Sequence, residues 1–96
     1  MSAVEYMPIC PYITGNVEGH WETNYGLGRR WPRLRLAQNE GAVMAQGTDD
    51  FLIAEVCGDE MLALTGAFGQ ELFNWDDSDY EPVAEALGLV WAGVST

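Results

Sequence analysis

The stretch Phe51–Cys57 constrains the fold more than any other feature of this sequence. It is apolar on both sides of an extended chain except at Glu55, which is typical of a strand in the centre of a sheet. Gly58 and Asp59 follow as a tight hairpin turn, and Met61–Thr65 continues as the partner strand. The sequence therefore predicts a β-hairpin at the centre of the molecule.

A second hairpin is predicted over residues 33–46. In Arg33–Gln38, Leu34 and Leu36 alternate with Arg33 and Arg35, the period of a half-buried strand. Asn39–Gly41 has the composition of a turn, and Ala42–Gln46 is the returning strand. Shorter strands are expected at Val4–Met7, Gly19–Asn24 and Glu71–Trp75.

One helix is expected after Asp76. Ser78 and Asp79 are suitable N-caps, acidic residues in the first turn favour the positive end of the helix dipole, and Pro82 is tolerated there. Gly88 leaves two alternatives. The helix ends at this glycine and Leu89–Val94 forms a strand, which we favour, or the apolar period of 3.6 residues continues to Val94.

These elements predict an α+β fold in one domain spanning residues 1–96. The expected sheet is small and antiparallel, with about four to six strands in hairpins or a meander, followed by one C-terminal helix. The expected buried core consists of Phe51, Ile53, Val56, Leu62, Leu64, Val83, Leu87 and Trp91.

Charge is distributed very unevenly along the chain. The chain has 15 acidic residues, four arginines and no lysine, for a net charge of −11. Residues 49–96 contain 11 of the acids and no basic residue. Such a field repels nucleic acid and anionic membranes and favours a basic protein surface, most commonly one that binds nucleic acid. The alternative is that the acidity serves solubility alone.

No residue pattern indicates catalysis, a cofactor or a metal. His20 is the one histidine, and its spacing from Cys10 and Cys57 matches neither a catalytic dyad nor a zinc site. We interpret both cysteines as reduced thiols. The N-terminus lacks a secretory signal and no segment is long enough to span a membrane, so we expect a cytoplasmic location.

Two motifs match their templates incompletely. The acidic run over residues 74–85 follows the spacing of a calcium loop, but Asp79 stands where that loop requires glycine. Gly26 and Gly28 begin a phosphate-binding pattern, but Trp31 stands in place of its third glycine. A helix-capping loop and a glycine-rich turn are the favoured interpretations.

Two groups of residues are candidates for binding a partner protein. Carboxylates from turns and from the helix start, gathered into one patch, would imitate a row of phosphates. They are Asp76, Asp77, Asp79 and Glu81, then Asp49, Asp50, Asp59 and Glu60. Trp31, Arg33 and Arg35, on one strand face, have the composition of a binding hot spot; alternatively, Trp31 is core and the arginines neutralise the protein's own acids.

These features predict a small, acidic, non-enzymatic binding protein that occupies a nucleic-acid-binding surface of another protein. Small acidic proteins of phages and mobile elements, including many anti-CRISPR proteins and restriction inhibitors, act in this way, and the likeness is one of size and charge. The alternative is a phage structural or assembly component, or a subunit that self-associates into a homo-oligomer through its hairpin edges or through its arginine and acidic surfaces.

Overall fold

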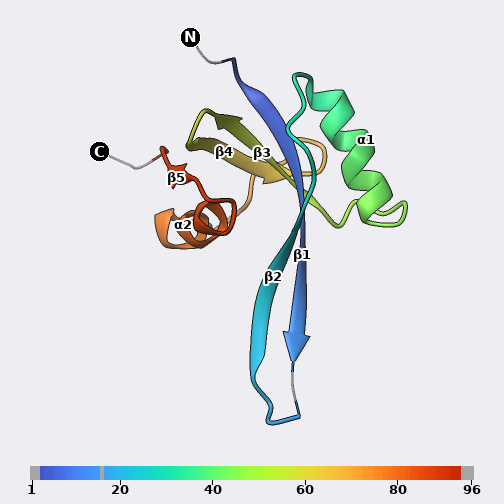
Figure 1. The fold of residues 1–96 in the computed structure, drawn as a ribbon, viewed down its shortest axis with the longest axis vertical. Coiled ribbons are helices and arrows are strands. Elements are labelled where there is room, and N and C mark those ends of the chain that lie inside the picture. Colours follow the sequence, from blue (N-terminus) through green and yellow to red (C-terminus); the bar gives the residue numbers. More distant parts are fainter. Residues whose placement is uncertain (1–2, 16, 94–96) are drawn as a thin grey trace.

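The structure is a computed structural model that describes residues 3–15 and 17–93. It is a small α+β domain with a curled, mixed sheet and two helices (Figure 1). The strands are ordered β2-β1-β3-β4-β5 across the sheet. The elements are β1 (Glu5–Gly15), β2 (Trp21–Leu27), α1 (Leu34–Met44), β3 (Leu52–Cys57), β4 (Glu60–Gly66), α2 (Asp77–Ala86) and β5 (Val90–Trp91).

The central hairpin agrees with the sequence prediction. β3 and β4 pair in antiparallel register around the turn at Gly58, which has a φ of +61°. The register shifts by one residue beside Glu55 and Val56, so that Leu62 is an extra residue in β4 without a direct partner. This bulge turns Met61 into the core and leaves Leu62 37% exposed, so the prediction that Leu62 is buried is wrong.

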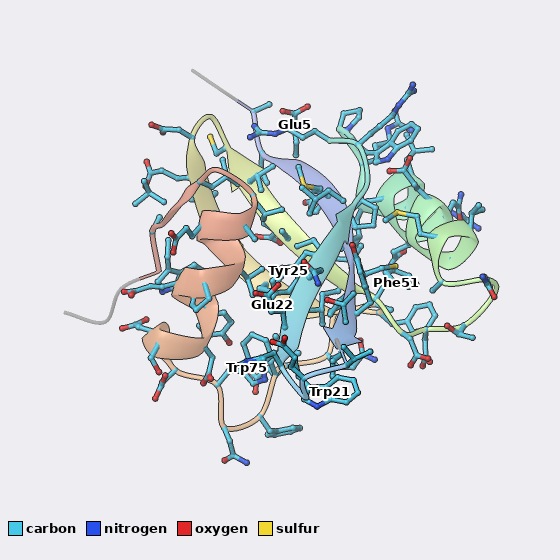
Figure 2. The ribbon with its side chains drawn as sticks, turned by 60° about the horizontal axis from the view of Figure 1, so that its bottom comes forward. Glu5, Trp21, Glu22, Tyr25, Phe51 and Trp75 are labelled. Atoms are coloured by element: carbon cyan, nitrogen blue, oxygen red, sulfur yellow. The ribbon has the colours of Figure 1, made fainter. Side chains whose placement is uncertain are left out.

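Each face of the sheet is covered by a helix, which explains why Phe51–Cys57 is apolar on both sides (Figures 1 and 2). Phe51 and Ile53 pack toward α1, whereas Val56 and Leu64 pack toward α2. Val83 of α2 is buried as predicted, and Leu87 and Trp91 pack against the same core while remaining partly exposed.

The hairpin predicted over residues 33–46 is wrong, because this segment is the helix α1. Its buried residues are Ala37 and Gly41, which are four positions apart and therefore share one face of a helix. A Cβ atom at Gly41 would collide with the ring of Phe51, so this glycine allows close packing. Leu34 and Leu36, whose alternation suggested a strand, are each 38% exposed.

The helix predicted after Asp76 is confirmed as α2, with a different cap. Asp76 itself is the N-cap, and it forms a capping box with Asp79. Pro82 lies beyond the first turn, inside the helix.

The predicted stop at Gly88 is confirmed. Gly88 has a φ of +72°, and the N–H of Leu89 donates to the carbonyl of Ala84, as in a Schellman motif. The strand that follows is shorter than expected, since β5 covers Val90–Trp91, and Val94 lies outside the described residues. β5 runs parallel to β4, which makes the sheet mixed rather than antiparallel.

The first two strands are longer than the sequence suggested. β1 runs through both Pro8 and Pro11, and its two halves have different partners: residues 5–9 pair with β3, and residues 9–15 pair with β2. Beyond Ile9 the two strands leave the body as a projecting hairpin (Figure 1). The segment predicted as a strand at Glu71–Trp75 is irregular.

Candidate protein-binding surfaces

Four of the predicted carboxylates lie at the start of α2, where hydrogen bonds fix three of them. Asp76 Oδ1 accepts a hydrogen bond from the N–H of Ser78, 2.9 Å away, and Asp79 Oδ2 accepts from the N–H of Asp76, also 2.9 Å away. Asp77 Oδ1 accepts from the indole of Trp91. The side-chain hydroxyl of Ser78 also donates to Asp76 Oδ1, and this bond is the main reason why the pKa of Asp76 is below its ordinary value. Glu81 is exposed on the next turn.

The turn between β3 and β4, which contains Asp59 and is followed by Glu60, lies beside β5 (Figure 1). The N–H of Val90 donates to the carbonyl of Asp59, and Glu60 lies opposite Val90 in the β4–β5 pair. The next residue of β5, Trp91, is the donor to Asp77. β5 therefore connects the turn to the start of α2. We call this set the acidic surface: Asp59, Glu60, Asp76, Asp77, Asp79 and Glu81.

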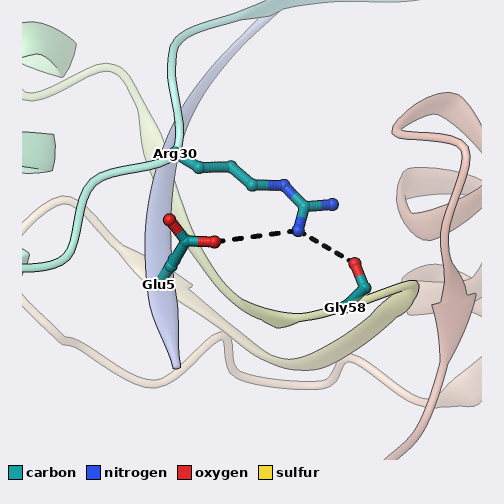
Figure 3. A network of polar contacts seen from close by, with 3 residues as sticks. All are labelled: Glu5, Arg30 and Gly58. Atoms are coloured by element: carbon teal, nitrogen blue, oxygen red, sulfur yellow. Dashed lines mark hydrogen bonds and ion pairs between the residues drawn. The ribbon is translucent and has the colours of Figure 1, made fainter. Parts of the chain in front are cut away.

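Arg30 holds the turn of the acidic surface in place (Figure 3). Its Nη1 donates to the carbonyl oxygen of Gly58, 2.9 Å away, and lies 4.0 Å from Oε1 of Glu5. Since the carboxylate of Glu5 belongs to β1, the guanidinium links the first strand to the β3–β4 turn. Arg30 thus has a structural position beside the acidic surface.

The other two predicted carboxylates are not part of the acidic surface. Asp49 and Asp50 lie in the loop between α1 and β3, directly before Phe51, which packs on the α1 side of the sheet. Asp50 borders a cleft of about 490 Å³ together with Cys10 and Met44. Burial, with a smaller contribution from the negative charge of Asp50, raises the pKa of the Cys10 thiol.

Trp31, Arg33 and Arg35 do not form the strand face that the sequence suggested. Trp31 forms a β-bridge with Tyr6, packs against the core on the α1 side, and donates from its indole to Glu40, 3.0 Å away. Arg33 is the N-cap of α1, and Arg35 lies on that helix. The alternative reading, in which Trp31 belongs to the core, agrees with this packing.

Strongly exposed apolar side chains also lie on an element that the sequence prediction did not identify as a site. We call it the arm: residues 11–15 of β1 with residues 21–24 of β2, all exposed except the half-buried Asn24. Figure 2 shows Trp21 and Glu22 at its outer end. Ile13 is 69% exposed and Trp21 is 72% exposed. The alternation of Thr, Trp and Tyr over residues 21–25 was the signal in the sequence.

The two faces of the arm differ in polarity. Residues that are paired across an antiparallel ladder share a face, so Ile13 and Trp21 lie on the face that continues to Ile9 in the core. A Cβ atom at Gly15 would collide with the indole of Trp21, so the ring lies across this glycine. The opposite face carries Tyr12, Thr14, Glu22 and Asn24, and Asn24 Nδ2 donates to Thr14 Oγ1.

A cleft of about 690 Å³ separates β2 from α2. Its walls are Thr23, Asn24 and Tyr25 of β2, and Pro82, Glu85 and Ala86 of α2. Side chains of consecutive strand residues point to opposite faces. A cleft lined by three consecutive residues therefore borders the backbone edge of β2 as well as one of its faces.

Some classes of site have no counterpart in the described chain. Among residues 3–15 and 17–93, no group of three or more His, Cys, Asp or Glu side chains is placed to hold a metal ion. Within the same residues, neither helix has the length and hydropathy to cross a bilayer. No protein-family model matches this chain, and neither a curated protein nor a solved structure matches it.

Proposed function

We propose that this chain is a non-enzymatic binding protein whose acidic surface occupies a basic surface of a partner protein, of the kind that otherwise binds nucleic acid. The observation that carries the proposal is that β5 links the β3–β4 turn, with Asp59 and Glu60, to the carboxylates at the start of α2. Residues 49–96 supply no basic side chain that could neutralise them.

The fixed geometry of these carboxylates supports the proposal. The capping box holds Asp76 and Asp79, and the indole of Trp91 holds Asp77. Charged groups that are already ordered lose less conformational entropy when a partner binds. A row of phosphates in a nucleic acid is likewise a set of closely spaced negative charges, one per about 1.7 Å of duplex axis.

The expected partner is a protein with an arginine- and lysine-rich groove. Nucleic acid itself is not expected to bind, because a net charge of −11 repels its phosphates. Inhibitors encoded by phages and mobile elements are the class of protein that fits this chemistry. In that role, the chain competes with DNA or RNA for the groove.

The test uses matched charge reversals in a quantitative pulldown from host lysate. Glu60→Lys with Glu81→Lys alters the acidic surface without removing an observed cap or hydrogen bond. Glu71→Lys is the control, because Glu71 is exposed in the β4–α2 loop outside the surface. We expect the partner to be released by added duplex DNA or RNA, and the double variant to bind about tenfold or more weakly.

Two results would contradict the proposal. One is a captured partner that is retained equally at low and high salt. The other is a partner whose binding falls equally in the double variant and in Glu71→Lys, because the effect would then depend on net charge rather than on this surface.

A self-associating or assembly subunit is the second candidate, and the arm is the observation that favours it. Ile13 and Trp21 expose an apolar face outside the body of the protein, and such faces commonly mark protein contacts. Sedimentation velocity of the pure protein tests this role. A concentration-dependent oligomer that Trp21→Ser converts to a monomer supports it, and a monomer at all concentrations contradicts it.

A further inference from the structure

The backbone of β1 shows which edge of each strand in the arm is unpaired. Tyr6 exchanges both backbone hydrogen bonds with Trp31, and the carbonyl of Pro8 accepts from Gly28, both on the β2 side. Successive residues of a strand direct their backbone groups to opposite edges. Even-numbered residues of β1 therefore face β2, and odd-numbered residues face the β3 side.

β1 pairs with β3 as far as Ile9, and beyond it no strand from the described residues pairs with the edge of β1 on the β3 side. Pro11 is an odd-numbered residue, so it lies at this open edge and contributes no N–H there. A proline at such a position is a known protection against pairing with another strand. The edge of β1 is thus blocked to further pairing.

The outer edge of β2 has no such protection. Gly26, Asn24 and Glu22 lie opposite even-numbered residues of β1 and face inward. Trp21, Thr23, Tyr25 and Leu27 therefore direct their N–H and carbonyl groups outward. β2 is the last strand on this side of the sheet, and no strand from residues 3–15 and 17–93 lies beyond it. The edge contains neither proline nor lysine.

From this edge and the cleft beside it, we infer that β2 binds an extended basic peptide segment of a partner protein as an additional antiparallel or parallel strand, held between β2 and α2. Main-chain hydrogen bonds to the outward groups of Thr23 and Tyr25 provide the affinity, as in other cases of strand addition. The cleft of about 690 Å³ receives the side chains on one face of the peptide.

The charges around the cleft determine the class of occupant. Glu85 lines the cleft, Glu22 lies one residue from its β2 wall, and the chain carries a net charge of −11. A second copy added at this edge would bring its own Glu22 and Glu85 against these carboxylates, which like-charge repulsion disfavours. A segment that alternates basic and apolar residues places its apolar side chains against Tyr25, Pro82 and Ala86.

This inference deepens the proposed function, because both require a basic partner, but it concerns a different surface. The probe is a labelled, end-capped peptide of alternating lysine and valine, as long as the seven residues of β2. Its control is the same peptide methylated at every backbone nitrogen, which keeps the charge and removes the donors. We expect the methylated peptide to bind about tenfold or more weakly in fluorescence anisotropy.

Protein variants test the same edge from the other side. Thr23→Pro removes one outward N–H and leaves the inward ladder to β1 intact, whereas Thr23→Val keeps that N–H in a side chain of similar shape. Backbone NMR spectra verify that each variant is folded. We expect Thr23→Pro to weaken peptide binding about tenfold, Thr23→Val to bind within about twofold of the native protein, and Glu85→Gln to weaken binding about threefold.

Several outcomes would overturn the inference. The inference is wrong if both peptides bind equally, whatever the variants do. It is also wrong if Thr23→Pro and Thr23→Val bind the peptide equally. Sedimentation that shows a dimer dissociated by Thr23→Pro would assign the edge to a second copy. If Glu60→Lys with Glu81→Lys abolishes peptide binding and Thr23→Pro does not, the β2 site fails and the acidic surface stands. The opposite pattern supports the β2 site alone.

Discussion

The indole Nε1 of Trp91 lies 2.8 Å from Oδ1 of Asp77 and donates a hydrogen bond to it. The ring of Trp91 also stacks on Tyr80, with ring centroids 4.5 Å apart. Tyr80 in turn contacts Trp75, which lies in the β4–α2 loop. These contacts hold the two-residue strand β5 against α2. Asp77 is therefore a structural residue as well as a source of negative charge.

Loss of this hydrogen bond should destabilise the protein. We expect Asp77→Ala to lower the free energy of unfolding by about 1.5–3 kcal/mol, the usual range for a hydrogen bond to a charged acceptor. Asp77→Asn keeps an acceptor at the same place and should lose less. Urea denaturation measures both variants, and an Asp77→Ala protein as stable as the native one would show that the bond contributes nothing.

Gly41→Ala should also destabilise the protein, although alanine is favoured over glycine inside a helix by about 1 kcal/mol. The added Cβ would collide with the ring of Phe51, which is buried and has little room to move. Overpacking of this kind costs about 1–3 kcal/mol, so the collision should dominate. Val43→Ala, on the exposed side of the same helix, is the control and should change stability by less than about 0.5 kcal/mol. A more stable Gly41→Ala protein would contradict the close packing.

Gly41 also shows why α1 was not predictable from local pattern. By composition alone, the run Asn39–Gly41 is typical of a turn. The glycine is needed because α1 packs closely over Phe51. The helix buries small residues, so its apolar period is weak, while the alternation of Leu34 and Leu36 imitates a strand. Tertiary packing outweighed the local signals.

Local signals were sufficient elsewhere. The turn at Gly58, the acidic start of α2 and the stop at Gly88 are encoded by residues next to one another. The acids of α2 were therefore identified as a group. β5 connects these acids of α2 to Asp59 and Glu60. Asp49 and Asp50 lie apart from the acidic surface because they follow α1, which was not predicted. The open edge of β2 depends on its place as the last strand of the sheet, which no local pattern states.

The bulge in β4 predicts opposite outcomes for two nearby leucines. Leu64 is 4% exposed in the core, and its truncation to alanine should lower the free energy of unfolding by about 2–5 kcal/mol. Leu62, the extra residue of the bulge, is largely outside the core, and Leu62→Ala should cost less than about 1 kcal/mol. Thermal or urea unfolding compares them. Equal losses would show that the register shift is absent.

Asp76 should make stability depend on pH in the acid range. Hydrogen bonds, first from Ser78, hold its folded pKa below the ordinary value. Below about pH 4 the unfolded chain therefore binds more protons than the folded one at this position. The contribution is present above that range and is lost as the pH falls through the folded pKa. Asp76→Asn should flatten the fall in stability measured by urea unfolding between about pH 4 and pH 2; an unchanged slope would contradict it.

Salt should stabilise the folded protein, because its net charge of −11 is concentrated in one half of the chain. Self-repulsion among exposed carboxylates destabilises a compact state. Raising NaCl from about 0.01 M to about 0.1 M shortens the screening length from about 30 Å to about 10 Å, so the midpoint of thermal unfolding should rise. Glu60→Gln with Glu81→Gln removes two charges of the acidic surface and should reduce that rise, whereas Val43→Ala leaves the charge unchanged and should keep it. A midpoint that falls with salt would mean that internal pairs such as Arg30 with Glu5 outweigh the repulsion.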